Sequence, residues 1–170
     1  MIDEKQIDFF SKNGAIFLKG YFTDWIEVLR SGIEKLINNP SPRERSYTPK
    51  DGTAPFFQDL CNWQRIPEFE KFIFNSDIGE VASKLMQSNT SRFFHDHVLV
   101  KEPGSSIVTP WHQDQSYYCT SGKQTISFWI PLDNISLNNT LSCISGSHKW
   151  GKLHKPKRFD GTDPVSYTHL

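Results

Sequence analysis

Pro110-Trp111-His112-Gln113-Asp114 is the stretch of this sequence on which the reading of the fold depends. It places an imidazole and a carboxylate two residues apart. On a β-strand, side chains at positions i and i+2 point to the same face, so we expect His112 and Asp114 to project together. Such a pair supplies two of the three ligands in a 2-His-1-carboxylate metal site. The competing interpretation is a surface strand with two solvated polar residues.

Further motifs accompany this stretch. They are NWQRIPEF at 62–69, VLVKEPG at 98–104, TPWHQD at 109–114, SFWIPLD at 127–133 and SGSHK at 145–149. Taken as a set, they resemble the phytanoyl-CoA dioxygenase family of Fe(II)- and 2-oxoglutarate-dependent oxygenases. The resemblance covers about residues 10 to 155.

The resemblance implies an activity and a set of site residues. The expected reaction hydroxylates a small organic substrate with O₂ and decarboxylates 2-oxoglutarate to succinate and CO₂. His112 and Asp114 match the family's catalytic metal ligands for Fe(II), and His97, Gln113 and Trp129 match positions beside 2-oxoglutarate. The carboxylate of Asp114 leaves no room for a halide on the metal, which favours hydroxylation over halogenation.

Two other functions stay open. In the first, the chain is a non-catalytic jelly-roll module that binds a metabolite, and His112 and Asp114 only hydrogen-bond that ligand. In the second, it is a zinc hydrolase that uses His95, His97 and Asp114, because two histidines at i and i+2 also share a strand face. Ordinary core packing is a further alternative for His97 and for Trp129.

The first half of the chain has helical periodicity. Asp3 and Gln6 match a capping box, and Gly14 stands where a helix would end. Residues 15–18 predict a brief apolar strand, and residues 39–55 predict a surface loop that could close as a lid. Apolar stripes with helical spacing predict helices at 3–12, 23–37, 66–74 and 76–86.

The second half changes to a period of two. In residues 92–101 and 125–132, aliphatic side chains alternate with polar and aromatic ones. One face of each strand would pack on helices while the other lines a ligand cavity. We therefore predict an α+β fold, a double-stranded β-helix (a cupin-like jelly roll) with the N-terminal helices packed on one sheet. The family resemblance implies the same fold.

Composition narrows the choice of partners. The chain has 170 residues with a formal net charge of zero, so no basic field favours nucleic acid or an anionic membrane. No apolar run approaches the roughly 20 residues of a membrane span. The start is not a signal peptide, and the three cysteines have no zinc-like spacing. We expect a cytoplasmic protein with reduced thiols.

The C-terminal end carries two expectations. In the family, a second histidine ligand and an arginine for the 5-carboxylate of 2-oxoglutarate lie further downstream, so residues 1–164 are expected to form a partial, C-terminally truncated dioxygenase domain. Such a fragment would be inactive alone. Residues 165–170, VSYTHL, resemble translated adapter sequence and are expected to be a non-native tail.

Overall fold

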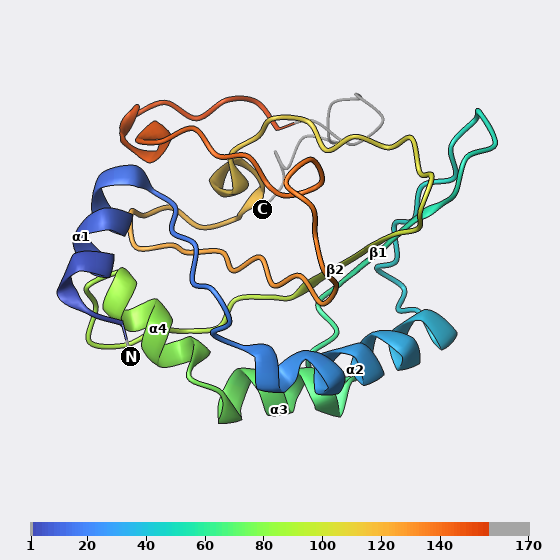
Figure 1. The fold of residues 1–170 in the computed structure, drawn as a ribbon, viewed down its shortest axis with the longest axis horizontal. Coiled ribbons are helices and arrows are strands. Elements are labelled where there is room, and N and C mark those ends of the chain that lie inside the picture. The colour runs from blue at the N-terminus through green and yellow to red at the C-terminus, as the bar shows by residue number, and fades with distance from the viewer. Residues whose placement is uncertain (1, 157–170) are drawn as a thin grey trace.

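The computed structural model describes residues 2–156, with helices along one side of the molecule and irregular segments opposite them (Figure 1). The expected tail at 165–170 therefore lies outside the described residues. The α-helices are α1 (Glu4–Asn13), α2 (Ile26–Asn38), α3 (Pro67–Asn75) and α4 (Ile78–Leu85). The strands are β1 (Phe56–Leu60) and β2 (His97–Lys101), and the 3-10 turns are η1 (Thr23–Trp25), η2 (Asp114–Tyr117) and η3 (Ser147–Lys149).

Helix α1 begins and ends as its sequence predicts. The backbone N–H of Gln6 donates to Asp3 Oδ1 (2.8 Å), and the N–H of Asp3 donates to Gln6 Oε1 (3.0 Å), which completes a capping box. Gly14 closes the helix in the left-handed region at φ 79°, with its N–H on the carbonyl of Phe10. The predicted caps of this helix are confirmed.

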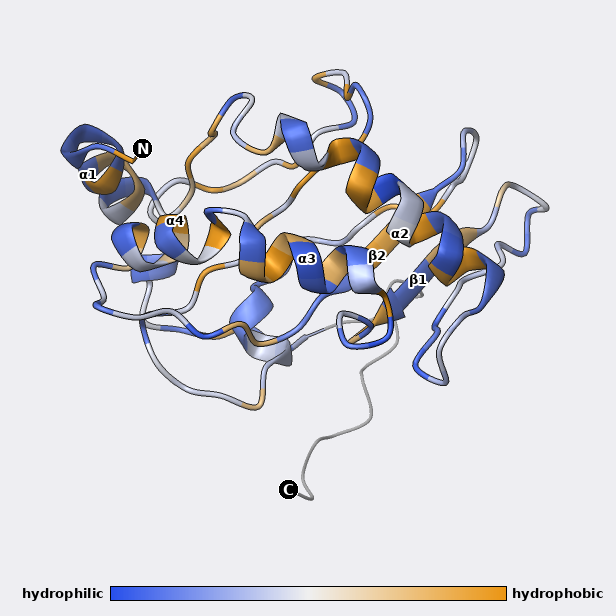
Figure 2. Ribbon diagram, turned by 90° about the horizontal axis from the view of Figure 1, so that it is seen from below, coloured by the Kyte–Doolittle hydropathy of each residue, from blue (hydrophilic) through white to orange (hydrophobic). Residues whose placement is uncertain are grey.

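The helices pack in pairs, α2 against α3 and α1 against α4. Figure 2, which views the molecule from the helical side, shows orange apolar stripes on helices that are otherwise blue and polar. The larger core joins α2, α3 and β2 and comprises Leu29, Leu36, Ile66, Phe69, Phe72 and Val98. None of the helices within residues 2–156 is long and apolar enough to cross a membrane.

Strands β1 and β2 pair antiparallel, with Phe56 opposite Lys101 and Leu60 opposite His97. Val98 is buried in the helical core, whereas Leu99 on the other face is 44% exposed. This confirms the predicted division of β2 into an aliphatic and a mixed face. Within residues 2–156 these are the strands of the one sheet, so the double-stranded β-helix stays a prediction.

Residues 15–18 and 125–132 were expected to be strands, and neither forms a strand in the structure. The alternation of side chains in the second segment is nevertheless kept. Ile126 and Phe128 pack on the smaller core, and Ile130 and Leu132 pack on the larger one, while Trp129 is 42% exposed. Hydrophobic packing orients this segment without a hydrogen-bonded neighbour strand.

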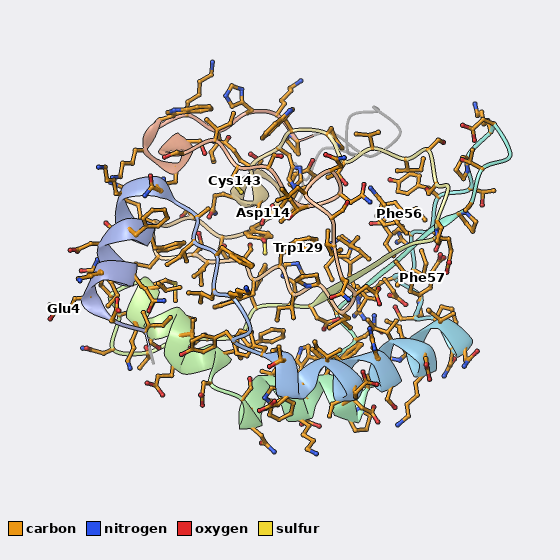
Figure 3. All side chains as sticks on the ribbon, in the orientation of Figure 1. Glu4, Phe56, Phe57, Asp114, Trp129 and Cys143 are labelled. Carbon is orange, nitrogen blue, oxygen red and sulfur yellow. The ribbon has the colours of Figure 1, made fainter. Side chains whose placement is uncertain are left out.

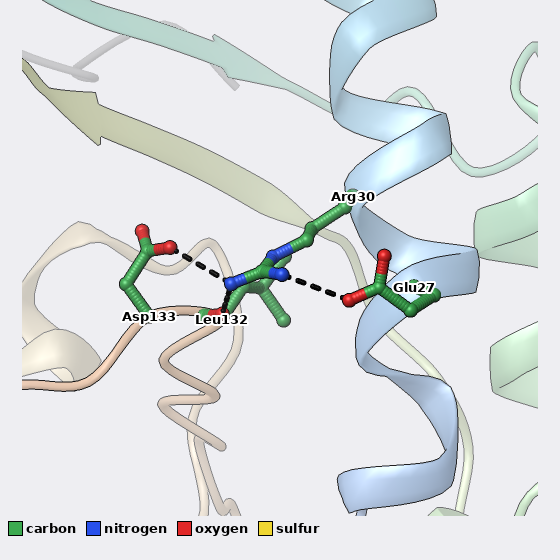
Figure 4. A network of polar contacts seen from close by, with 4 residues as sticks. All are labelled: Glu27, Arg30, Leu132 and Asp133. Atoms are coloured by element: carbon green, nitrogen blue, oxygen red, sulfur yellow. Dashed lines mark hydrogen bonds and ion pairs between the residues drawn. The ribbon is translucent and has the colours of Figure 1, made fainter.

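An arginine holds the end of that segment against α2. Arg30 donates through Nη2 to the carbonyl of Leu132 (2.6 Å) and to Asp133 Oδ1 (3.0 Å), and through Nη1 to Glu27 Oε1 (2.8 Å), as Figure 4 shows. A guanidinium can serve three acceptors at once because its donors lie in a rigid fork. Residues 102 positions apart are thereby joined.

The loop at 39–55 is anchored at its start. Ser41 is buried and donates from Oγ and from its N–H to the two oxygens of Asp59, at 2.6 and 2.7 Å. Further along, the N–H of Tyr47 donates to the carbonyl of Phe56, which extends the pairing beside β1. Motion as a lid would therefore be confined to the part of the loop beyond Tyr47.

Candidate metal centre

His112 and Asp114 lie side by side, although they are not on a strand. Gln113 between them has extended backbone angles (φ −116°, ψ 123°), and Asp114 begins the short turn η2. One extended residue is enough to turn positions i and i+2 to the same side. The distance from His112 Nε2 to Asp114 Oδ1 is 3.2 Å. The predicted juxtaposition is present, and the predicted strand is wrong at this point.

The other ring nitrogen of His112, Nδ1, already has a hydrogen-bond partner. Nδ1 lies 2.7 Å from the carbonyl oxygen of Pro110. Since a carbonyl can only accept, Nδ1 carries a hydrogen, and the hydrogen between Nε2 and Asp114 Oδ1 is therefore the one that a metal ion would replace. A backbone carbonyl on the far nitrogen is a common way to fix the tautomer of a metal-binding histidine.

The two groups stabilise each other's charged forms. The hydrogen bond to Asp114 raises the pKa of His112, and the same bond lowers the pKa of Asp114. Their side chains stay accessible, at 33% and 47% exposure. A nitrogen and an oxygen that share a proton at this distance can share a cation instead, so the pair suits a metal ion.

Two adjacent tyrosines contact the pair. The ring of Tyr117 packs edge-to-face on His112, with centroids 5.7 Å apart. The hydroxyls of Ser127 and Tyr118, which lie 3.0 Å from each other, help His112 to lower the pKa of Asp114. The structure therefore places an aromatic ring directly against one of the two candidate ligands.

His95 and His97 lie near the same carboxylate. Burial lowers the pKa of His97 to about 4, with the charge of His95 as the next cause and Asp114 acting in the opposite direction. Burial also lowers the pKa of His95. Both rings are therefore neutral at pH 7. His97 Nε2 lies 3.0 Å from Oε1 of Gln58, a buried residue of β1.

The zinc alternative receives no support from this arrangement. Among residues 2–156, no three His, Cys, Asp or Glu side chains are grouped closely enough to hold a metal ion. Asp96, which lies between the two histidines, faces the other way. Its carboxylate accepts the backbone N–H groups of Asn62 and Trp63 at 2.8–3.0 Å, just before α3 begins.

The two remaining predicted cosubstrate residues differ in their surroundings. The amide of Gln113 donates to the carbonyl of Lys152 (3.1 Å) and accepts the N–H of His154 (2.8 Å). Gln113 thus ties a distant segment to the ligand stretch. Trp129 has a partly exposed ring, and Figure 3 labels it in the central part of the view. Contact of either residue with 2-oxoglutarate stays a prediction.

Sequence reasoning missed three partners of the site. Two of them are hydrogen-bond partners of the histidines: Gln58 on β1 of His97, and the carbonyl of Pro110 of His112. The third is the hydroxyl of Ser127, which helps to lower the pKa of Asp114. Gln58 lies in the strand that pairs with β2, and the sequence did not reveal that long-range pairing. Two surface hollows, of about 440 and 280 Å³, lie along α2, and neither is lined by the candidate ligands.

Comparison with known proteins gives two matches. A sequence model of the family described as phytanoyl-CoA dioxygenase (PhyH) matches residues 10–165. A protein of Arabidopsis thaliana named phytanoyl-CoA dioxygenase is 30% identical over 95 residues, which are 55% of this chain. The match spans 33% of that relative's length. No solved structure matches the chain significantly.

Proposed function

This chain belongs to the phytanoyl-CoA dioxygenase family, and on that premise we propose that the protein is an Fe(II)- and 2-oxoglutarate-dependent oxygenase that hydroxylates a small organic molecule. The family is a dioxygenase family, which implies O₂ and a small-molecule substrate in general terms. The observation that carries the finer proposal is the 3.2 Å approach of His112 Nε2 to Asp114 Oδ1.

The donor set fits ferrous iron. Imidazole nitrogen and carboxylate oxygen on one side of the metal are two members of the 2-His-1-carboxylate set, which leaves positions open for cosubstrate and O₂. His112 presents the correct nitrogen because Pro110 holds the other. Asp114 is ionised at neutral pH, because its pKa is lowered. Metal binding at this pair would displace the proton they share, so it should release protons.

When both are bound, iron and 2-oxoglutarate would supply the chemistry, which is C–H hydroxylation coupled to decarboxylation of 2-oxoglutarate to succinate and CO₂. The residues of this chain bind and orient. His112 and Asp114 would hold the metal, and His97, whose single ring N–H donates to Gln58 Oε1, would line the cosubstrate site as a neutral ring. The exposed part of Trp129 offers an apolar wall. The primary substrate is left open.

The jelly-roll fold belongs to the same proposal. It is supported by the two faces of β2 and by the alternation kept in residues 126–132. The helices on the aliphatic side of β2 agree with it. A binding module without catalysis would use the same fold, so the proposals of fold and of activity need separate tests.

Absorbance under anaerobic conditions tests the activity proposal. Fe(II) and 2-oxoglutarate are added to a form of the protein extended beyond residue 170, which is the parent, and to its His112→Ala and Asp114→Ala variants. We expect a visible charge-transfer band in the parent that is absent from both variants. His154→Ala and Asp8→Ala, which change the same residue types away from the pair, should keep the band.

Each alternative gives a different result. A binding module gives no band with any protein, and a zinc hydrolase retains colourless zinc through dialysis. With oxygen admitted, succinate formation should depend on both His112 and Asp114. Succinate formed equally by the parent and the two alanine variants would refute the assignment of the ligands.

A further inference from the structure

The side-chain amide of Gln113 is bonded to the backbone of a distant segment. Its Nε2 donates to the carbonyl of Lys152 (3.1 Å), and its Oε1 accepts the N–H of His154 (2.8 Å), from residues 39 and 41 positions along the chain. An amide has one accepting and one donating end, so only one orientation satisfies both partners. We call these two hydrogen bonds the Gln113 clamp.

The clamp holds the residue whose backbone sets the two candidate ligands. Gln113 has φ −116° and ψ 123°, and His112 and Asp114 share one side only while these angles stay extended. Residues 110–113 belong to no strand, so ladder hydrogen bonds do not keep them extended. In an extended chain the side chain of Gln113 points opposite to those of its neighbours. The clamp therefore restrains this backbone from the side remote from the pair.

The segment that bears the partners of the clamp is anchored at its other end. The N–H of Gly146 donates to the carbonyl of Asn13 (2.8 Å), and Ser145 Oγ donates to Asn13 Oδ1 (2.7 Å). Asn13 is the last residue of α1. Residues 145–154 thus connect the end of a helix with the ligand stretch, so the clamp pulls against a fixed support.

From this geometry we infer that Gln113 is a positioning residue, which keeps His112 and Asp114 together through its clamp on residues 152–154. The inference rests on the proposed role of the pair as metal ligands. Because both ends of the amide have backbone partners, this role differs from the cosubstrate contact that the family resemblance implies. Gln113 acts through its neighbours and is not itself a catalytic residue.

Two substitutions break the clamp from opposite sides. Gln113→Met keeps the length of the side chain and removes both hydrogen bonds. His154→Pro removes the N–H that Gln113 accepts and leaves the ligand stretch unchanged, whereas His154→Ala keeps that N–H and is the matched control. We expect Gln113→Met and His154→Pro to weaken metal binding by about 10-fold, the size that the loss of one or two hydrogen bonds allows. The double variant should bind no more weakly than Gln113→Met, because both changes remove the same contact.

The experiment measures Co(II) binding under anaerobic conditions, from the visible d–d bands and by competition with a chelator. The parent is the form of the protein extended beyond residue 170. The metal-free proteins are also digested with trypsin, because the peptide bond after Lys152 is a trypsin site within the clamp. The expected result for Gln113→Met and His154→Pro is weaker Co(II) binding, altered d–d bands and faster cleavage after Lys152, with His154→Ala like the parent.

Three results would overturn the inference in different ways. Faster cleavage with parent-like Co(II) binding would mean that the clamp only holds the segment, while the proposed metal site stands. Equal weakening in His154→Ala and His154→Pro would mean that the clamp is not the cause. If the parent shows no d–d bands, the metal site itself is wrong, and the inference fails with the proposed function.

Discussion

Replacement of Gly14 by alanine tests how the C-terminal part of the described chain is attached to the first helix. An ideal Cβ at Gly14 would lie 2.2 Å from His148 Nδ1, and the residue has φ +79°. At the same helix end, His148 Nε2–H donates to the carbonyl of Ser11 (3.1 Å), and the N–H of Gly146 donates to the carbonyl of Asn13 (2.8 Å). The substitution therefore strains the backbone and displaces the ring.

The magnitude follows from two separable effects. A non-glycine residue in the left-handed region is destabilised by about 1–2 kcal/mol. Displacement of His148 removes its hydrogen bond and weakens the neighbouring one, at about 1 kcal/mol each. We expect Gly14→Ala to lower the free energy of unfolding by about 3 kcal/mol. Gly52→Ala has φ +76° and no atom near the new methyl group, so it should show the backbone strain alone.

Urea denaturation followed by tryptophan fluorescence measures these changes. The decisive comparison is Gly14→Ala in a His148→Ala background, where the methyl group no longer meets the ring. There the substitution should be no more destabilising than Gly52→Ala. An undiminished penalty in that background would refute the reasoning, because the clash with His148 could not then be its cause.

Three further predictions use the same assay. Gly32→Ala places a methyl group 2.6 Å from Phe69 Cε1. Although alanine favours helices, this overpacking should destabilise the α2–α3 pair by about 1–3 kcal/mol. A stabilised variant would contradict this packing. Asp59→Ala should cost about 3 kcal/mol, because it leaves the buried donors of Ser41 unpaired, whereas Asp59→Asn, which keeps one acceptor, should cost less. The pKa of His97 is lowered from 6.5 to about 4, so protonation of this ring favours the unfolded chain. The stability that the neutral ring provides is complete above pH 6.5 and is lost as the pH falls toward 4. His97→Gln should flatten that part of the pH profile, and an unchanged slope would count against the lowered pKa of this ring.

Local patterns in the sequence predicted several features correctly. The caps of α1 depend on residues within three or four positions of each other, and so does the meeting of His112 with Asp114 across Gln113. The aliphatic face of β2 also follows from alternation alone. These features need no knowledge of distant parts of the chain, because bonds along the backbone already set the distance between the groups concerned.

Other predictions needed partners that the sequence did not identify. A strand requires a neighbour to receive its hydrogen bonds, and residues 125–132 are instead oriented by packing on two cores and by Arg30. The lid hypothesis for residues 39–55 depended on composition, which gave no sign that Asp59 would bind Ser41. In both cases the competing interaction came from a segment remote in sequence.

Sequence alone determined the identity of the candidate ligands, their common orientation and the family to which the chain belongs. Tertiary structure decided what surrounds them, namely the ring of Tyr117 on His112 and the contacts of Gln113 with Lys152 and His154. It also decided that the turn at residues 145–148 closes onto α1, more than 130 positions away. The physical reason is the separation in sequence over which each interaction acts. Periodicity and caps act over a few residues, whereas these contacts exist only after apolar burial has brought distant segments together.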